Sequence, residues 1–441
     1  MHILSYVRVI YPVCVHTSIA FLIVVMGLFF PSLPAFAAKQ AQAHRAISLT
    51  QAIEQTLQYH PDLKAYRFQN QALQGGVQQA QVPAPYELNM GVENAFGSGS
   101  FSSVSDMQTS LGIAWVLDSE LTQARVALAQ AKLSQTELEK QNKTLDVAAA
   151  TAVFYVTLLA QEQELLLASL AMKNAQSALA DVSKRVSAGR AHIVDQYRAK
   201  AHLSTKALVV EDLHHEIEAT KAQLAAQWGE VVIEQADFFA SGQLANTPEI
   251  VSVKQAFANL KQHPRMQLLS VQQRVTESAV ALAIEDEKPL WQISTGFKHH
   301  NREDDVSLMF GVSVPLWTEN RNRGQVVKLQ AEQNQRQAQT DAWQQAVSTQ
   351  LLLIIHKLKH NQHVIDGLSE QTIPALEAAN DHAEKAYKLG SYSYNDWYQV
   401  KEEWVESKLA LISAYKNMHL LNIELERLTG TQITQTHTLQ Q

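Results

Sequence analysis

The sequence has almost no cysteine, and its basic residues form no cluster. Cys14 is the only cysteine among 441 residues, so a mature chain without its first residues would have neither disulfides nor thiol chemistry. The formal net charge is −7, and an acidic balance without a basic patch argues against nucleic acid as a partner. Proline is also sparse, with 11 residues, which suits long exposed helices.

The patterns that carry catalysis are missing as well. The sequence contains no nucleophile elbow, no phosphate-binding glycine loop and no pair of carboxylates in a catalytic pattern. We therefore predict that the protein is not an enzyme, has no catalytic residue and binds no cofactor.

The first 37 residues resemble a secretory signal peptide. Arg8 gives a basic start, residues 19–30 are apolar, and residues 35–37 form a small-x-small cleavage site. An uncleaved membrane anchor is the alternative, but the apolar segment is short for a span of about 20 residues. No later segment reaches about 18 uncharged apolar residues. We expect an exported protein without a membrane helix.

One glycine and aspartate pattern occurs twice in the chain. Three pairs of identical residues share an offset of 201: Gly189 and Gly390, Asp195 and Asp396, Gly229 and Gly430. A shared offset indicates an internal duplication. Long helical patterns run into the first glycine of each copy and leave after the aspartate. Because glycine ends helices and aspartate is a good N-cap, each copy predicts a helical hairpin with a tight tip.

Two segments of the first half, about 86–95 and 106–117, alternate apolar and polar residues. This alternation predicts strands with one apolar face. Each is about ten residues long, the length that crosses a bilayer when tilted. Tyr86 and Trp115, at the strand ends, fit an interfacial aromatic girdle. A soluble hairpin packed on a helical body fits these two strands equally well.

The same organisation recurs in the second half and predicts a mainly α fold with a small β part. The predicted segments are a signal peptide (1–37), a first structural repeat (38–229), a linker (230–250), a second structural repeat (251–430) and a disordered tail (431–441). Each repeat combines long antiparallel helices with one β-hairpin. The remaining predicted elements are strands at about 290–298 and 305–315, long helices at about 119–187 and 319–389, and return helices at about 195–228 and 395–428.

Four strands of this length cannot close a wall in lipid. An open edge in the bilayer leaves backbone groups unpaired at several kcal/mol each, and known barrels start at about eight strands. Three copies would supply twelve strands. We therefore predict a homotrimer with a twelve-stranded β-barrel, continued by cyclic symmetry as an α-helical barrel.

These features resemble the TolC family of outer-membrane efflux factors over nearly all of the mature region. The resemblance rests on the element order, on the two glycine motifs that begin at Arg185 and Tyr387, and on Val314-Pro315-Leu316-Trp317 followed by residues 320–324. It implies a homotrimer in the outer membrane of a Gram-negative cell, in contact with lipid and extending into the periplasm. It also implies a passive duct that serves a periplasmic adaptor (membrane fusion) protein and an inner-membrane pump of the resistance-nodulation-division type.

Within that family the chain is similar to the heavy-metal, cobalt-zinc-cadmium branch. Pro83-x-Pro85 and residues 92–99, with Phe96-Gly97-Ser98-Gly99, carry this similarity. Residues 117–120 depart from the basic turn usual in that branch. Heavy-metal cations are thus the expected cargo. Drug efflux and type I protein secretion remain alternatives, as does a soluble periplasmic coiled-coil adaptor.

The resemblance assigns eight residues to the periplasmic tips, in contact with the adaptor: Gly189, Asp195, Tyr387, Gly390, Tyr392, Tyr394, Asp396 and Trp397. As N-caps the aspartates would each contribute around 1 kcal/mol. As pore-facing carboxylates they would form a ring that attracts cations, and we favour the caps. The aromatic residues, with Tyr398, fit either packing of the turn or an exposed docking surface.

Histidines are the remaining candidates for metal ligands. Three of them share one helical face at i, i+4 and i+7, a pair is adjacent in the first half, and another pair precedes an acidic loop. For each group a solvated polar surface is the favoured interpretation, so we predict no metal site. The residues concerned are His356, His360, His363, His214, His215, Glu216, His299, His300, Glu303, Asp304 and Asp305.

Overall fold

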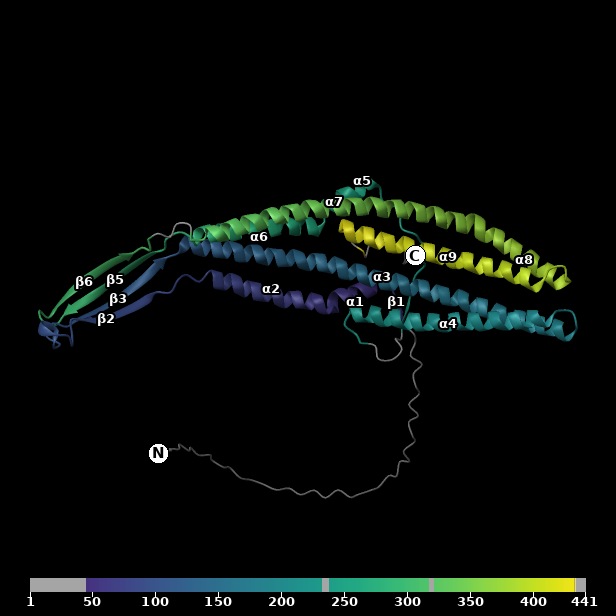
Figure 1. Cartoon of the computed structure of the whole chain (residues 1–441), viewed down its shortest axis with the longest axis horizontal. Helices are drawn as coiled ribbons and strands as arrows, with labels where there is room; N and C mark the ends of the chain where they lie inside the picture. The colour runs from purple at the N-terminus through teal and green to yellow at the C-terminus, as the bar shows by residue number, and fades with distance from the viewer. Residues whose placement is uncertain (1–44, 232–237, 317–320, 432, 434–441) are drawn as a thin grey trace, which may run out of the picture. The chain divides into compact units, whose positions relative to one another are not determined.

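The residues that the computed structural model describes are 45–231, 238–316, 321–431 and 433 (Figure 1). All of them belong to one compact unit, His44–Gln441. The predicted signal peptide and nearly all of the predicted disordered tail lie outside the described residues.

The β part contains one four-stranded antiparallel sheet in the order β2-β3-β5-β6 (Figure 1). Its strands are β2 (Glu87–Glu93), β3 (Gln108–Leu117), β5 (Trp291–His300) and β6 (Asp305–Ser313). β2 and β3 form one hairpin, β5 and β6 form the other, and β3 pairs with β5. The strands form where the sequence alternates apolar and polar residues, because successive side chains point to opposite faces.

Two facing glycines allow the hairpins to join. Gly112 in β3 lies opposite Gly296 in β5. A Cβ atom on Gly296 would lie 2.5 Å from the carbonyl oxygen of Leu111, and one on Gly112 would lie 3.1 Å from that of Thr295. Larger residues would push the strands apart, so this close backbone approach requires glycine.

The helices of the first half are α1 (Leu49–Tyr59), α2 (Pro61–Ala80), α3 (Ser119–Ser187) and α4 (Ile193–Gln227). α1 ends at His60 because Pro61 begins α2, where its missing N–H group has no helical partner to lose. The His60 ring caps α2 by accepting a hydrogen bond from the Asp62 amide at 3.1 Å. α3 contains 69 residues without a break and is therefore about 100 Å long.

A single residue, Asp118, joins β3 to α3. Its side chain is buried, and its carboxylate accepts hydrogen bonds from the Ala84 amide at 3.0 Å and the Thr122 hydroxyl at 3.1 Å. The segment that enters β2, the end of β3 and the first turn of α3 are thus held together at one carboxylate.

The helices of the second half are α5 (Val253–Leu260), α6 (Pro264–Glu285), α7 (Arg323–Gly367), α8 (Ile373–Leu389) and α9 (Tyr394–Thr429). A π-helical turn, Leu368–Thr372, separates α7 from α8. Pro374 follows this turn, lacks an N–H group and crowds the carbonyl four residues earlier. The Thr372 hydroxyl donates to the Gly367 carbonyl at 3.2 Å. The second long helix is therefore interrupted, whereas the sequence analysis predicted one continuous helix at about 319–389.

A small parallel pair joins β1 (Arg45–Ile47), at the start of the predicted first repeat, to β4 (Phe238–Ala240), in the predicted linker, and the sequence analysis predicted neither strand. The Tyr155 hydroxyl in α3 lies within hydrogen-bonding distance of two carbonyls, those of Ile47 (2.9 Å) and Ser241. Ile433, in the predicted disordered tail, is buried in the same core, so that prediction is wrong at this residue.

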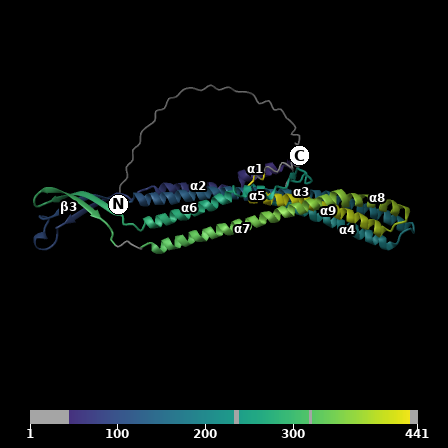
Figure 2. The same cartoon turned by 90° about the horizontal axis from the view of Figure 1, so that it is seen from above.

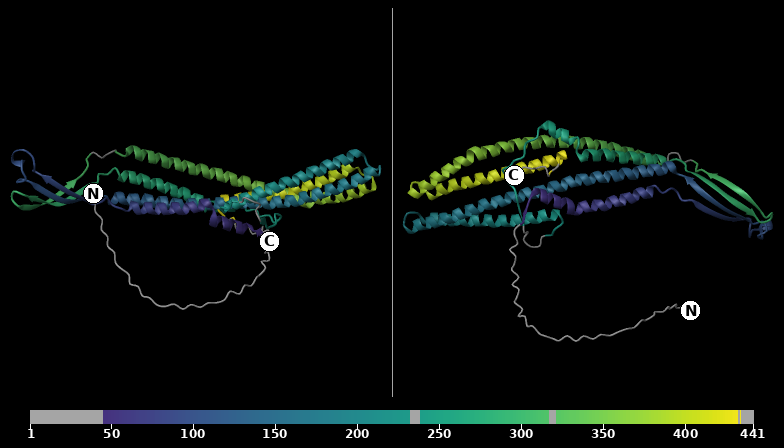
Figure 3. Two further views of the ribbon diagram at one scale, coloured as in Figure 1. Left: turned by 90° about the horizontal axis from the view of Figure 1, so that it is seen from below. Right: turned by 180° about the vertical axis from the view of Figure 1, so that it is seen from behind.

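The helices pack in two arrangements along α3 (Figures 2 and 3). Towards the sheet, α2 packs on α3, α3 on α6, and α6 on α7. Towards the tips, α4 packs on α3, α3 on α9, and α9 on α8. Within the part of the chain that the structure describes, one flank therefore consists of β2, α2 and α4, and the opposite flank of β6, α7 and α8.

One helix in the described residues is long and apolar enough to cross a membrane. It is α3, which contains a stretch of mean hydropathy 1.4. Of that stretch, 61% is buried inside the chain. Tyr155, Val156 and Leu158 lie in it and are fully buried core residues. This burial is typical of a core helix.

Candidate membrane-facing sheet and helical tips

One face of the sheet is apolar and uncovered. The register aligns Met90, Leu111, Phe297 and Leu308 across the four strands. Met90 is 75% exposed and Phe310 is 80% exposed. The exposed apolar side chains of this face are Leu88, Met90, Val92, Leu111, Ile113, Phe297, Val306, Leu308, Phe310 and Val312. A continuous patch of this kind marks a surface that contacts lipid or another protein.

The opposite face carries small and polar residues. Gly112 and Gly296 lie in its middle row. Lys298 forms an ion pair with Glu93 at 2.8 Å, and Gln292 donates to Glu87 at 3.2 Å. The sheet is therefore polar on one side and apolar on the other, which is the pattern of a barrel wall between lipid and water.

Both outer edges of the sheet, β2 and β6, have only one strand neighbour among the residues that the structure describes. An unpaired edge exposes a row of backbone N–H and C=O groups. Next to an apolar face, such groups would be costly in lipid unless another strand pairs with them.

The helical tips end as the repeated motif predicts. Gly189 has φ 71° and Gly390 has φ 80°, both in the left-handed region. The amide of Arg190 donates to the Arg185 carbonyl at 2.8 Å, which satisfies a carbonyl at the end of α3. Glycine adopts this conformation without the penalty that a Cβ atom brings.

The two tip aspartates are not the N-caps that the sequence analysis predicted. In α9 the Ser393 hydroxyl accepts a hydrogen bond from the Asp396 amide at 3.2 Å, and in α4 the His192 ring accepts from the Val194 amide at 3.2 Å. Asp195 and Asp396 lie in the first helical turn. The correction has a physical reason, since an acceptor three residues earlier reaches the same free amides. The aspartates still stabilise the positive helix ends.

The aromatic residues of the second tip form a buried cluster, which we call the aromatic cluster: Tyr387, Tyr394, Trp397 and Tyr398. The rings of Tyr387 and Trp397 stack with centroids 4.6 Å apart. The Arg185 guanidinium lies 4.2 Å from the centroid of the Tyr387 ring and donates to the Tyr387 carbonyl at 3.2 Å. Burial raises the pKa of Tyr387 to about 12. This cluster joins the two tips by packing.

Only Tyr392 among the predicted tip aromatics has a substantially exposed side chain, at 40%. Apolar side chains that the sequence analysis did not select are more exposed at the same tips. Leu389 is 85% exposed, Tyr197 is 69% exposed and Val194 is 50% exposed. Their signal in the sequence was their position beside the glycine motifs, next to residues that we did select.

The histidine groups do not converge. His356, His360 and His363 are exposed on α7. The nearest acidic contact in the β5–β6 loop joins His299 Nε2 to Asp304 Oδ1 at 3.8 Å. Among the described residues, no three histidine, cysteine, aspartate or glutamate side chains meet in a way that could hold a metal ion.

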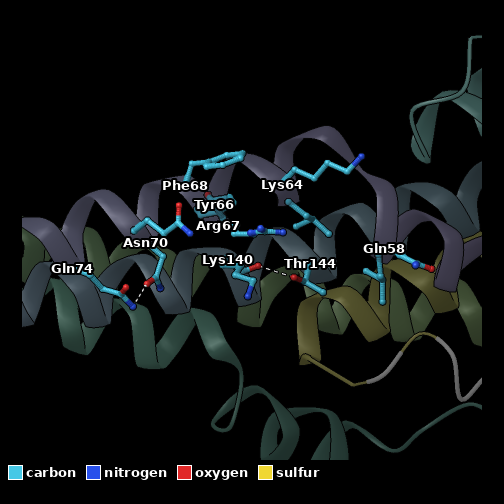
Figure 4. Close-up of a pocket in the computed structure, with 12 residues that line it drawn as sticks. Gln58, Lys64, Tyr66, Arg67, Phe68, Asn70, Gln74, Lys140 and Thr144 are labelled. Carbon is cyan, nitrogen blue, oxygen red and sulfur yellow. Dashed lines mark hydrogen bonds between the residues drawn. The ribbon is translucent and has the colours of Figure 1, made fainter. Parts of the chain in front are cut away.

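A cleft of about 670 Å³ lies between α2 and α3 (Figure 4). Lys64, Arg67 and Lys140 give it a basic lining, beside aromatic residues of α2. Phe68 is 64% exposed at its rim. Because α2 forms one flank of the described unit, this cleft also lies on that flank.

Comparison with known proteins identifies the family to which this domain belongs. The family model described as "Outer membrane efflux protein" matches residues 52–238, which include β2, β3, α3 and α4. The chain carries an outer membrane efflux protein domain. The protein is thus an outer-membrane efflux channel component, and the predicted family and location are confirmed. The soluble-adaptor alternative does not fit this assignment.

A curated relative and solved structures agree with the match. The chain is 21% identical over 362 residues to the cobalt-zinc-cadmium resistance protein CzcC of Cupriavidus metallidurans, covering 81% of this chain and 84% of CzcC. The outer membrane protein VceC of Vibrio cholerae has the same fold, with a TM-score of 0.70, 19% identity and coverage of 87% and 96%. CusC, whose structures are described in terms of transmembrane channel formation, matches with a TM-score of 0.70 and 14% identity. The match covers 87% of this chain and 92% of CusC.

Proposed function

We propose that three copies of this chain close a twelve-stranded barrel in the outer membrane and form a passive export duct. The observation that carries this proposal is the four-stranded sheet with an apolar face and two unpaired edges. A sheet in lipid must close on itself. Edge β6 of one copy would pair with edge β2 of the next.

The helices support the same arrangement. The flank with β2 also contains α2 and α4, and the flank with β6 also contains α7 and α8. Two different flanks that meet head to tail form a closed ring when the rotation between copies closes. In such a ring, α7 of one copy would cover the cleft on α2 of the next, and the helices would continue the barrel into the periplasm.

We infer that the chain consists of two tandem repeats, with the boundaries 38–229 and 251–430. In each half, a helix leads into a hairpin and is followed by a long helix, a glycine tip and a return helix. The return helices end at Gly229 and Gly430, with φ 78° and 73°. Similar left-handed backbone angles at the same offset support a duplication.

The partners follow from the duct. An outer-membrane channel has no energy source of its own, so we propose that a periplasmic adaptor joins the tips to an inner-membrane pump of the resistance-nodulation-division type. Gly189, Gly390, Tyr392 and Asp396 are exposed at the tips and available for this contact. Asp195 is half-buried, and Tyr387, Tyr394 and Trp397 would act by holding the tip in shape.

We propose heavy-metal cations as the cargo, because the cobalt-zinc-cadmium resistance protein CzcC matches most of the chain. The test is a deletion strain grown on zinc, cadmium, cobalt, copper and a panel of dyes. We expect lower tolerance to at least one of the metals, restored by the intact gene. Lower tolerance to dyes alone would favour drug efflux, and unchanged tolerance to every metal would contradict this cargo.

A further inference from the structure

The loop between β2 and β3 exposes apolar side chains although it lies beyond the ends of both strands. Phe96 is 80% exposed, and Phe101 and Val104 are each 44% exposed. The only charged residue in the segment 94–106 is Asp106. Its carboxylate pairs with Arg302 at 2.6 Å, so this charge is neutralised. The rest of the segment is small and polar, with Asn94 and five serines, so these exposed apolar side chains stand out in a loop without a free charge.

The backbone holds Phe96 in an unusual conformation. Its φ is 59° and that of Asn94 is 56°, both in the left-handed region that bulky residues rarely adopt. The amide of Gly97 donates to the Phe101 carbonyl at 2.6 Å and closes the loop behind Phe96. Such strain persists only where the surrounding structure fixes it, and it concentrates at functional surfaces.

The neighbouring β5–β6 loop holds the end of this loop that leads into β3. The Asn301 side chain donates to the Val104 carbonyl at 2.8 Å, and the Asn301 amide donates to the Met107 carbonyl at 3.0 Å. Together with the Arg302–Asp106 pair, these bonds tie the loop to the second hairpin. The β3 end of the loop, which includes Val104, is therefore fixed to the second hairpin.

We propose that the β2–β3 loop is a membrane-surface anchor, in which Phe96 enters the interfacial layer of the outer leaflet. The strand that leads into the loop exposes Met90 and Val92 on the apolar face of the sheet, so the loop continues a surface already suited to lipid. Aromatic side chains favour the membrane–water interface. A loop without free charge suits it too. The inference rests on the proposed barrel.

The experiment uses site-directed spin labels on the full-length protein in lipid nanodiscs. With Cys14→Ser the chain has no other thiol, so one engineered cysteine takes one nitroxide. Phe96→Cys places the label at the anchor, and Ser98→Cys places it nearby with the phenyl ring intact. Leu88→Cys on the apolar face is the lipid control, and Glu303→Cys in the charged β5–β6 loop is the water control. Collision rates with oxygen and with a nickel chelate distinguish lipid from water.

We expect the ratio of oxygen to nickel-chelate collisions at both loop positions to be severalfold above that at residue 303 and close to that at residue 88. A water-like ratio at both loop positions, with a lipid-like ratio at 88, overturns the anchor and leaves the barrel intact. Spin–spin broadening between copies at residue 96 would place the loops against one another and also overturns the anchor. A water-like ratio at residue 88 overturns the proposed barrel and the anchor with it.

Discussion

Two left-handed glycines with nearly equal backbone angles have different surroundings. Gly430 has φ 73°, and a Cβ atom there would lie 3.0 Å from His263 and 3.1 Å from Pro264. Gly390 has φ 80° and open space around it. Each glycine avoids the conformational penalty that a side chain brings, but only Gly430 also allows a close contact between helix ends.

Gly430→Ala should therefore destabilise the protein more than Gly390→Ala. We expect Gly390→Ala to lower the free energy of unfolding by about 1 kcal/mol, the cost of a left-handed alanine. Gly430→Ala should cost about 2 kcal/mol or more, because steric overlap adds to that cost. Denaturant unfolding in detergent measures both. Equal losses for the two variants would contradict the contact at Gly430.

Glu162 in α3 should make stability depend on pH. Burial raises the pKa of this carboxyl from 4.5 to about 7, although the Ala240 amide and the charge of Lys221 oppose the shift. A raised carboxyl pKa means that the folded state disfavours the charged form. The stabilising contribution is therefore complete below pH 4.5 and is lost as the pH rises through about 7.

Glu162→Gln keeps an acceptor for the Ala240 amide, which lies 3.2 Å from Glu162 Oε2. At pH 8 we expect the variant to be more stable than the wild type by about 1–2 kcal/mol. At pH 4.5 the difference should vanish, which makes the acidic measurement an internal control. A constant difference at both pH values would argue against this assignment of the titration.

At the scale of elements, the aromatic cluster should hold the two helical tips of one chain together. Trp397 is 6% exposed and stacks on Tyr387. We expect Trp397→Ala to cost about 3 kcal/mol or more, because it removes a buried aromatic side chain. Hydrogen exchange should then accelerate in α8 and α9 near the tip. The matched control is Tyr392→Ala, which should change stability by less than about 0.5 kcal/mol.

The outcome that would disagree is fast exchange in both tip variants or in neither. In the first case the whole tip would depend on surface contacts, and in the second the cluster would not stabilise the packing of the two tips. Binding of an adaptor hairpin can be measured on the same two variants. A loss of binding in Tyr392→Ala without a loss of stability would support the proposed contact.

Sequence reasoning worked where the signal is local. Alternation predicted all four long strands, and the glycine motifs predicted both tips. It failed at the aspartate caps because Ser393, three residues earlier, competes for the same amides. It also missed β1 and β4, since three-residue strands whose partners lie almost two hundred residues away in the chain have no periodicity to detect.

At the scale of the whole molecule, the proposed ring can be tested at the edges of the sheet. β2 and β6 of one chain are three strand spacings apart, about 14 Å, too far for a disulfide within the chain. We expect a cysteine at Met90 combined with one at Leu308, Met309 or Phe310 to give covalent trimers on oxidation in at least one pairing. Cys14→Ser is the background, and single-cysteine variants are the controls.

Covalent species larger than three copies would contradict a closed ring of three. Monomers alone in every pairing would contradict the edge pairing of β6 with β2. Mass measurement of the unmodified protein in mild detergent gives an independent answer, with a trimer expected and a monomer contradictory.

The junction at Asp118 has a mechanical consequence. One side chain fastens the end of β3 to a helix of 69 residues that contains no proline and no π turn. In the second half, the π turn after Gly367 gives the long helix a weak point that α3 lacks. Each protomer thus has one continuous long helix and one long helix that a π turn interrupts. Force applied at the tips would be transmitted to the first hairpin through α3. On the way to the second hairpin, the π turn between α8 and α7 would absorb part of it by bending.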